Sequence, residues 1–226
     1  MKRVLLSWSS GKDSAWTLQV LRRDPEIEVV GLLTTVNEAY DRVAMHAVRR
    51  ELLLAQAAAA GVEPWVVPIP DACVNEEYER IMGAQIEKAR EQRIGAIAFG
   101  DLYLEDVRAY RERQMAGTGI DLLFPLWQQP TRQLAQEMLA AGVRAYVTCV
   151  DPRALDPTFA GREWNASFLA DLPAGVDPCG ENGEFHTFVF AGPMLAQPVP
   201  VETGDVVERD GFVFADLRLA DPQRRP

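Results

Sequence analysis

Short apolar runs alternate with amphipathic segments along the first 150 residues, and this alternation limits the fold more than any other feature of the sequence. The runs are rich in Val, Ile, Leu and Ala, and they occupy residues 4–6, 27–35, 65–69, 94–99 and 145–150. A strand that is apolar on both faces needs cover on both sides, which parallel sheets obtain from the helices that connect their strands. The sequence therefore predicts an α/β fold: a five-stranded parallel sheet with helices on both faces.

Five further segments carry apolar residues at the spacing of a helix. They cover residues 15–21, 45–60, 75–93, about 104–116 and about 131–141. Asn75, followed by two acidic residues, is typical of a helix start, and Thr131 is predicted to be an N-cap. Gly61 stands where a C-terminal cap belongs.

The chain changes in composition after Asp151, where proline and glycine become frequent. Residues 188–190, 198–201 and 211–217 are typical of short strands or hairpins. These features predict a smaller C-terminal α+β domain. We expect one domain at residues 1–125 and a second at residues 126–226, with a boundary that falls between residues 119 and 151.

The strongest chemical signal is the Ser-Ser-Gly-Lys-Asp-Ser segment at residues 9–14, called the phosphate loop below, which joins the first strand to the first helix. Backbone N–H groups and a helix N-terminus in such a turn attract anions, and Lys12 adds a full positive charge. Gly11 allows close approach of the backbone. Asp13 after the lysine excludes a Walker loop, which requires Ser or Thr at that position. A plain strand-to-helix turn of small residues is the alternative.

The phosphate loop resembles the S-G-G-K-D-S pyrophosphatase loop (PP-loop) of the adenine-nucleotide alpha-hydrolase superfamily, with Ser10 in place of the first glycine. Enzymes of this superfamily have a Rossmann-like fold of the HUP type. They cleave ATP to AMP and pyrophosphate, usually by adenylating an oxygen atom of a second substrate. The resemblance implies that residues 1–125 bind ATP and that residues 126–226 bind the second substrate.

A second motif narrows the resemblance to one family. Residues 179–187 (Cys-Gly-Glu-Asn-Gly-Glu-Phe-His-Thr) are similar to the E-G-G-E-[YF]-E-T signature of the diphthine–ammonia ligase family, and residues 100–101 and 124–127 also resemble its pattern. His186 replaces the usual glutamate and Asn182 replaces a glycine, a form that looks like a bacterial branch. Bacteria do not make diphthamide, so the resemblance does not transfer the family's substrate, a modified histidine of elongation factor two.

The resemblance implies an ATP-dependent amide ligase of the AMP-forming type. A substrate carboxylate attacks the α-phosphorus of ATP, pyrophosphate leaves, and ammonia then displaces AMP to form an amide. The residues that the resemblance assigns to ATP are Ser9, Ser10, Gly11, Lys12, Asp13, Ser14, Gly100 and Asp101. Those assigned to the acceptor or to ammonia are His46, Glu181, Gly183, Glu184 and Thr187. Catalytic roles fall to Lys12, Glu181, Glu184 and His186, and Asp13 and Asp101 are the expected ligands of a Mg²⁺ ion.

Each assignment has a structural alternative. The two aspartates can be a helix-start acid and an ordinary turn residue. The two glutamates can belong to a solvated acidic loop, although paired carboxylates beside an ammonia site suit a general base. His186 can be structural, and His46 can lie at a solvated helix start.

Composition narrows the class of function. The chain carries 33 acidic and 23 basic residues, a net charge of -10, which argues against a nucleic-acid partner. Its three cysteines include no CxxC pair, which excludes a disulfide framework and a four-cysteine metal site within one chain. We see no signal peptide and no apolar run near the roughly 18 residues of a membrane span, so we expect a soluble cytoplasmic protein. A homodimer is left open.

Two other classes of function are alternatives to an amide ligase. An RNA-modifying enzyme of the superfamily usually needs paired cysteines and a basic surface, and this chain has neither. A nucleotide-binding regulator without a second substrate would not need residues 179–187. No embedded Cys-His glutaminase unit is visible, so free ammonia or a partner glutaminase is the expected donor. The prediction is an amide ligase whose acceptor, a protein side chain or a small carboxylate, is unknown.

Overall fold

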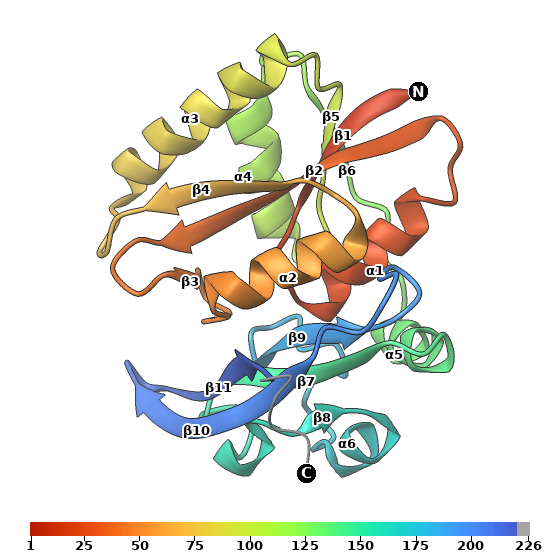
Figure 1. Ribbon diagram of the computed structural model, residues 1–226, viewed down its shortest axis with the longest axis vertical. Helices are drawn as coiled ribbons and strands as arrows, with labels where there is room; N and C mark the ends of the chain where they lie inside the picture. Colours follow the sequence, from red (N-terminus) through yellow and green to blue (C-terminus); the bar gives the residue numbers. More distant parts are fainter. Residues whose placement is uncertain (221–226) are drawn as a thin grey trace.

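The computed structural model describes residues 1–220, and its N-terminal part is built around one sheet (Figure 1). Five strands of this sheet are parallel, in the spatial order β4, β2, β1, β5, β6. They are β1 (Lys2–Ser7), β2 (Ile27–Asn37), β4 (Pro64–Ile69), β5 (Ala96–Ala98) and β6 (Asp121–Leu123). A short strand, β3 (Arg42–Val43), pairs antiparallel with the end of β2. This order is that of a Rossmann-like fold and confirms the predicted class.

Helices cover both faces of this sheet (Figure 1). One face carries α1 (Lys12–Leu21) and α2 (Arg50–Ala60), and the other carries α3 (Asn75–Glu91) and α4 (Glu105–Met115). Strand β1 shows the reason: Val4 and Leu6 belong to the core beneath α1 and α2, whereas Leu5 belongs to the core beneath α3 and α4. Because alternate residues of a strand point to opposite faces, a wholly apolar strand requires both layers.

The C-terminal part forms a second, antiparallel sheet around β7 (Arg144–Val150). One edge of β7 pairs with β9 (Phe185–Ala191), and the other pairs with β8 (Glu163–Trp164) and β11 (Phe212–Leu219). Strand β10 (Val201–Arg209) pairs with β11 at the edge. The helices of this part are α5 (Thr131–Ala140), α6 (Ala166–Asp171) and the 3₁₀ turn η1 (Pro157–Phe159). The predicted α+β character of the C-terminal part is confirmed.

The membership of the parallel sheet differs from the prediction. Residues 145–150 lie in β7 of the second sheet, and the fifth parallel strand is β6, which the sequence did not reveal. Strand β6 has three residues and starts with an exposed aspartate, so no apolar run marks it. The division of the chain after residue 125 stays a prediction.

The helix predicted at residues 45–60 begins later, at Arg50. Met45 and Ala47 have left-handed backbone, with φ of 63° and 54°, which a right-handed helix cannot include. Arg42 donates a hydrogen bond to the carbonyl oxygen of Ala47 at 2.7 Å and so supports the turn. The prediction was therefore wrong for residues 45–49 and right for the rest of the helix, and His46 lies in a tight turn between β3 and α2.

Other helix ends follow the sequence more closely. Gly61 caps α2 with φ of 65°, and α3 begins at Asn75, both as predicted. The N-cap of α5 is Pro130, not Thr131. The hydroxyl of Thr131 instead donates to Asp177 at 2.6 Å, which ties α5 to the segment before β9.

The two sheets share a hydrophobic core. The larger buried cluster contains residues of β1 and α2 together with residues of β7 and β9. Arg22, at the end of α1, donates to the carbonyl oxygens of Ala60 and Met194 and so joins the two parts. Strand β9 lies against α1, beside the phosphate loop. None of the helices within residues 1–220 combines the length and apolar character that crossing a membrane requires.

Candidate active site

The candidate site lies at the carboxyl ends of β1 and β5, where the strand order of the parallel sheet reverses. Ligands of open α/β sheets bind in the crevice at such a point. A cavity of about 570 Å³ opens here, and its wall includes the phosphate loop, the turn after β3, and residues 179–187 of the C-terminal part. This volume is within the usual range of small-molecule sites. The two motifs of the sequence therefore meet at one cavity.

The phosphate loop is held from two sides. The carbonyl oxygen of Ser10 accepts hydrogen bonds from the N–H of Val189 on β9 and from Nε2 of Gln56 on α2, both at 3.0 Å. Ser10 has φ of 67°, in the left-handed region that favours glycine. A non-glycine residue there costs about 1 kcal/mol, which these two contacts offset.

Close packing explains two of the predicted glycines. A Cβ atom on Gly11 would lie 3.0 Å from Cε1 of His46 and 3.2 Å from the carbonyl oxygen of Thr187. A Cβ atom on Gly100 would lie 3.0 Å from the backbone carbon of Asp13. The end of β5 therefore packs directly on the first turn of α1, and side chains are excluded from both contacts.

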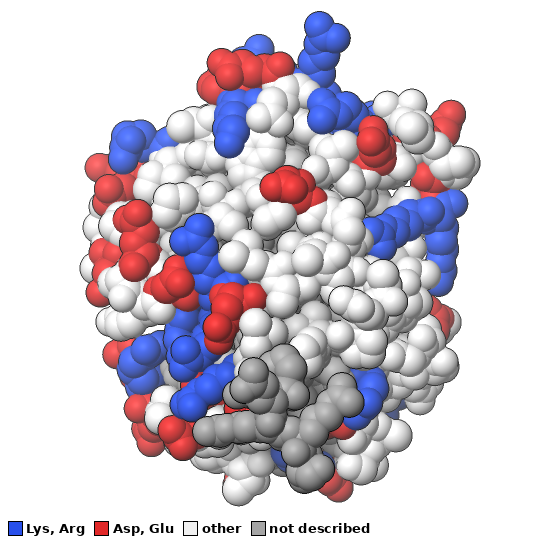
Figure 2. All heavy atoms as spheres, viewed as in Figure 1, with Lys and Arg blue, Asp and Glu red and all other residues white. Residues whose placement is uncertain are grey.

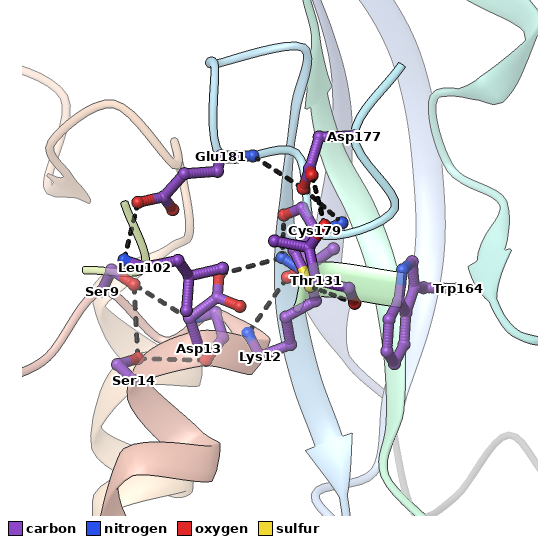
Figure 3. Close-up of polar contacts among 12 residues, drawn as sticks. Ser9, Lys12, Asp13, Ser14, Leu102, Thr131, Trp164, Asp177, Cys179 and Glu181 are labelled. Carbon is purple, nitrogen blue, oxygen red and sulfur yellow. Dashed lines mark hydrogen bonds and ion pairs between the residues drawn. The ribbon is translucent and has the colours of Figure 1, made fainter. Parts of the chain in front are cut away.

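Hydroxyl groups surround the loop (Figure 3). Ser14 donates to the carbonyl oxygen of Gly11 at 3.0 Å, and its Oγ lies 3.3 Å from Oγ of Ser9. Oγ1 of Thr187 accepts the backbone N–H of Lys12 at 3.1 Å. Because Ser9, Ser14 and Thr187 all line the cavity, their hydroxyls can turn towards a bound phosphate.

Lys12 is buried between the two parts of the molecule, with its side chain 2% exposed. Nζ donates to Asp13 at 2.9 Å and to the carbonyl oxygen of Cys179 (Figure 3). It also lies 5.4 Å from the ring centre of Phe185 and 6.0 Å from that of Trp164. Burial favours the neutral amine, but the acidic neighbours outweigh it, and the pKa of Lys12 is raised. The phosphate loop therefore keeps its positive charge.

The two aspartates predicted to hold magnesium differ in their surroundings. Oδ1 of Asp13 is buried and finds no hydrogen-bond partner among residues 1–220, and burial raises the pKa of this carboxyl. Asp101 is held by Arg111 through two bonds, at 2.6 and 3.1 Å. No three His, Cys, Asp or Glu side chains in the described part of the chain are grouped as for a metal. Asp13 keeps one oxygen unbonded beside the phosphate loop and fits a Mg²⁺ ion shared with phosphate oxygens, whereas both oxygens of Asp101 are bonded to Arg111.

Glu181 reaches across the cavity to the loop after β5 (Figure 3). Its Oε1 accepts the N–H groups of Leu102 at 2.7 Å and Tyr103 at 3.3 Å. Burial is the main influence on this carboxyl and raises the pKa of Glu181 to about 7. Such a group exchanges a proton readily near neutral pH, which suits a general acid or base.

Glu184 faces its own loop instead of the cavity. Its buried carboxylate accepts the N–H of Asp177 at 3.0 Å, the N–H of Asn182 at 3.0 Å and the side-chain amide of Asn182 at 2.9 Å. Gly180 and Gly183 have φ of 68° and 86°, and they turn the chain around this carboxylate. Glu181 and Gly183 line the cavity, whereas Glu184 does not. The contacts of Glu184 fit a role in shaping the loop.

The two histidines of the chain meet at the cavity wall. Their ring centres are 4.4 Å apart, with the planes inclined by 37°. His46 comes from the turn after β3, and His186 comes from β9. Burial lowers the pKa of both rings, to about 4 for His186, and the charge of Lys12 acts in the same direction. Both imidazoles are therefore neutral at pH 7.

Sequence reasoning missed two residues that shape the site. Gln56 accepts the indole N–H of Trp8 at 2.9 Å and donates to the carbonyl oxygens of Ser10 and Val189. Arg111 neutralises Asp101 from α4. Gln56 interrupts an otherwise Leu- and Ala-rich helix face, and that polar interruption was the available signal. Arg111 is one of several arginines on a polar helix, so nothing in the sequence marked it.

The charge distribution of one face can be followed in Figure 2. Basic and acidic side chains are interspersed there around a broad uncharged area. No continuous basic surface is seen on the described part of this face. A polyanion therefore finds no extended complementary surface on that side of the molecule.

Comparison with known proteins matches both parts of the chain to one family. The model of the diphthamide synthase N-terminal domain matches residues 1–121, and that of the diphthamide synthase C-terminal domain matches residues 130–214. The chain is 25% identical over 155 residues to the diphthine–ammonia ligase of Bos taurus, covering 66% of this chain and 58% of that protein. It is 26% identical over 153 residues to the Rattus norvegicus protein of that name (62% and 57%) and 25% identical over 150 residues to the Homo sapiens protein (64% and 56%). The chain thus spans less than two thirds of these relatives.

Proposed function

Because this chain belongs to the diphthamide synthase family, we propose that it is an ATP-dependent amide ligase that adenylates a carboxylate and then amidates it with ammonia. One observation carries this proposal: the phosphate loop and Glu181 line the same cavity, at the point where the strand order of the parallel sheet reverses. The named relatives are diphthine–ammonia ligases. Because the chain spans only part of their length, we propose their activity and substrates for this chain.

The first step requires charge to be stabilised on a departing pyrophosphate. The N-terminal N–H groups of α1 and the hydroxyls of Ser9 and Ser14 surround the place where such an anion would bind. Lys12 retains its positive charge and needs only to exchange the Cys179 carbonyl for a phosphate oxygen. Asp13 would hold a Mg²⁺ ion, which would neutralise further phosphate charge when bound. Hydrogen-bond donors that are already oriented before the reaction stabilise the charge of the transition state, and this is usually the largest contribution to the rate of such a step.

The second step brings an acceptor and ammonia to the same cavity. Glu181 faces this space from the C-terminal part and titrates near neutral pH, so it can take a proton from the attacking nitrogen. The acceptor is a carboxylate, for which diphthine is the candidate that the relatives' names suggest. A cytoplasmic enzyme would meet ATP and ammonia together, and we propose that location.

A pyrophosphate-release screen tests the proposal. The protein is incubated with ATP, MgCl₂ and NH₄Cl, and with a panel of carboxylates that includes diphthine-bearing elongation factor two. We expect AMP and pyrophosphate in equal amounts with at least one acceptor, and a loss of about 100-fold or more in Lys12→Met. The proposal fails if the protein binds no adenine nucleotide, or if Lys12→Met releases pyrophosphate at the wild-type rate.

A further inference from the structure

A second cavity, of about 390 Å³, lies beside the first, between the turn after β3 and the hairpin that joins β10 to β11 (Figure 1). The two cavities share part of their wall, which is called the junction below. The residues of the junction are Val43, Ala44, Met45, Ile69 and His186. No residue of the phosphate loop lines the second cavity. It therefore offers room for a second substrate that does not overlap a nucleotide at the phosphate loop.

The floor of the second cavity is a row of side chains across the C-terminal sheet. His186 on β9 lies opposite Cys149 on β7, and Cys149 lies opposite Phe214 on β11. Directly opposed residues point to the same face of a sheet, and all three line the cavity. Neighbouring strands are about 4.8 Å apart, so the row extends about 10 Å from the junction. Burial raises the pKa of the Cys149 thiol to about 12 and lowers that of His186 to about 4, so the floor is uncharged at pH 7.

Arg209 stands at the far end of this floor. Its guanidinium lies 5.0 Å from the ring centre of Tyr40 and 5.1 Å from that of Phe214. A two-residue turn follows Arg209, and Asp210 and Gly211 in this turn have φ of 53° and 80°. Both angles are those of a tight hairpin, which fixes the position of the residue before it. Contact with aromatic rings orients the planar guanidinium while its N–H groups stay at the edge of the plane.

The N–H groups of Arg209 are open to a ligand. The acid that pairs with it is Asp210, whose carboxylate is 3.6 Å from Nε and 88% exposed. That distance is too long for a hydrogen bond, and an exposed ion pair contributes little. Arg42, the other arginine of the cavity, already donates to Asp216 and to a backbone carbonyl. The remaining acid, Asp71, is exposed to solvent. An anion in the second cavity therefore finds its best partner in Arg209.

We propose that the second cavity binds the acceptor, and that the acceptor is a small carboxylate with a second anionic group, a carboxylate or a phosphate, which Arg209 binds. This inference rests on the proposed ligase function. The reactive carboxylate lies at the junction, the uncharged body lies over Cys149 and Phe214, and the second anion lies about 10 Å away. A guanidinium binds either anion through two parallel hydrogen bonds. A cationic group at that end would be repelled, because Arg209 already occupies the place beside the two rings that suits a cation.

Calorimetric titration tests this binding without turnover. The protein is saturated with Mg²⁺ and an ATP analogue that has a methylene bridge between the α- and β-phosphorus. It is then titrated at pH 7 with suberate, octanoate or 8-aminooctanoate, which have the same chain length and differ at the far end. The two ends of extended suberate are about 10 Å apart. We expect suberate to bind about 10-fold more tightly than octanoate, and 8-aminooctanoate to bind most weakly.

Equal affinities for suberate and octanoate would overturn the inference. Failure of the ATP analogue to bind would instead count against the ligase function itself. A fourth ligand, 7-phosphonoheptanoate, carries a phosphonate in place of the far carboxylate. We expect it to bind more tightly than octanoate as well, and the tighter of the two dianions identifies the anion that Arg209 prefers.

Charge reversal separates binding from a structural role of Arg209. We expect Arg209→Glu to bind 8-aminooctanoate more tightly than suberate, because a distorted cavity would weaken both without reversing their order. Arg209→Gln should lower the affinity for suberate to that for octanoate. The matched control is Arg23→Gln, because Arg23 is exposed, lies 5.6 Å from the ring centre of Trp16 and lines neither cavity. An unchanged order in Arg209→Glu, or an equal loss in Arg23→Gln, would contradict the proposal.

Kinetics extend the test to the acceptor that supports pyrophosphate release. We expect Arg209→Gln to raise KM for this acceptor by about 10-fold and to leave KM for ATP unchanged. Equal increases in both KM values would show that Arg209 supports the fold of the site and does not bind the acceptor.

Discussion

Lys12 and Asp13 are adjacent in the chain and paired in space, so a change at either residue alters the charge balance of the other. We expect Lys12→Met to destabilise the fold by about 3 kcal/mol, because the Asp13 carboxylate loses its cation in a largely buried place. The double variant Lys12→Met/Asp13→Asn should recover more than half of this loss and remain without activity. Urea unfolding measures both free energies. A double variant no more stable than Lys12→Met would refute the pairing argument.

Glu181 should make stability depend on pH. The pKa of its carboxyl is about 7 in the folded protein, against 4.5 as its ordinary value, so the folded state binds more protons between these two pH values. Stability contributed by the protonated carboxyl is present below pH 4.5 and is lost as the pH rises through 7. Glu181→Gln keeps an oxygen acceptor for Leu102 and removes this loss.

The measurement is the difference in unfolding free energy between Glu181→Gln and the wild type at pH 5 and at pH 8. We expect the difference to favour the variant more at pH 8 than at pH 5. The same difference at both pH values would show that Glu181 titrates near its ordinary pKa.

Single residues also show how far the sequence alone could reach. The phosphate loop and residues 179–187 were recognisable from their order, and most of their side chains do line the cavity. Which glutamate faces the cavity was not predictable, because it depends on the left-handed turns at Gly180 and Gly183. The partner of Asp101 was also not predictable, because α4 contains several arginines and the sequence does not show that Arg111 is the one that binds Asp101.

At the scale of elements, the packing of β5 on α1 depends on Gly100. Its added Cβ would meet the backbone of Asp13, which cannot move aside as a flexible side chain would. We expect Gly100→Ala to destabilise by about 1–3 kcal/mol and to weaken nucleotide binding. Gly83→Ala in α3 is the matched control: its Cβ meets nothing within 4 Å, so helix propensity should raise stability by up to about 1 kcal/mol. The measurement is the thermal unfolding midpoint of both variants. Equal changes in the two midpoints would contradict the claim that β5 packs on α1 through Gly100.

Gln56 connects helix α2 to the phosphate loop, because its side-chain amide forms hydrogen bonds with Trp8, Ser10 and Val189. Gln56→Leu leaves these buried groups short of partners, and we expect a loss of about 2 kcal/mol in stability together with weaker ATP binding. The control is Gln133→Leu on α5, where the amide bonds Glu137 at the surface, and a change within about 0.5 kcal/mol is expected. Calorimetric titration with an ATP analogue completes the comparison. Unchanged affinity in Gln56→Leu would show that the tether does not hold the loop.

Elements differ in how well their sequence marked them. Strands β1, β2 and β4 are apolar runs between turns and were predictable at their positions. Strand β7 is equally apolar but belongs to the other sheet. An apolar run indicates that a strand is buried, but it does not indicate which strand lies beside it. Strand β6 is too short to give a pattern, and its place is set by pairing with β5.

At the scale of the whole molecule, the site exists only because the two sheets share a core. Lys12 and Thr187 are 175 positions apart in the chain, yet the N–H of the first donates to the hydroxyl of the second. Such a contact leaves no trace in local periodicity. The net charge of -10 is likewise a whole-chain property, and at the site acidic groups face a buried lysine and the cavity as well as solvent.

In the proposed reaction, the phosphate loop directs a carboxylate to the α-phosphorus of ATP. An acceptor selected by the pyrophosphate screen can be labelled with ¹⁸O in its carboxylate and converted in the presence of ammonium. If the carboxylate is adenylated, one ¹⁸O atom passes to the phosphate of AMP, and mass spectrometry of AMP will find it there. AMP without the label, or the label in inorganic phosphate released beside ADP, would contradict the account.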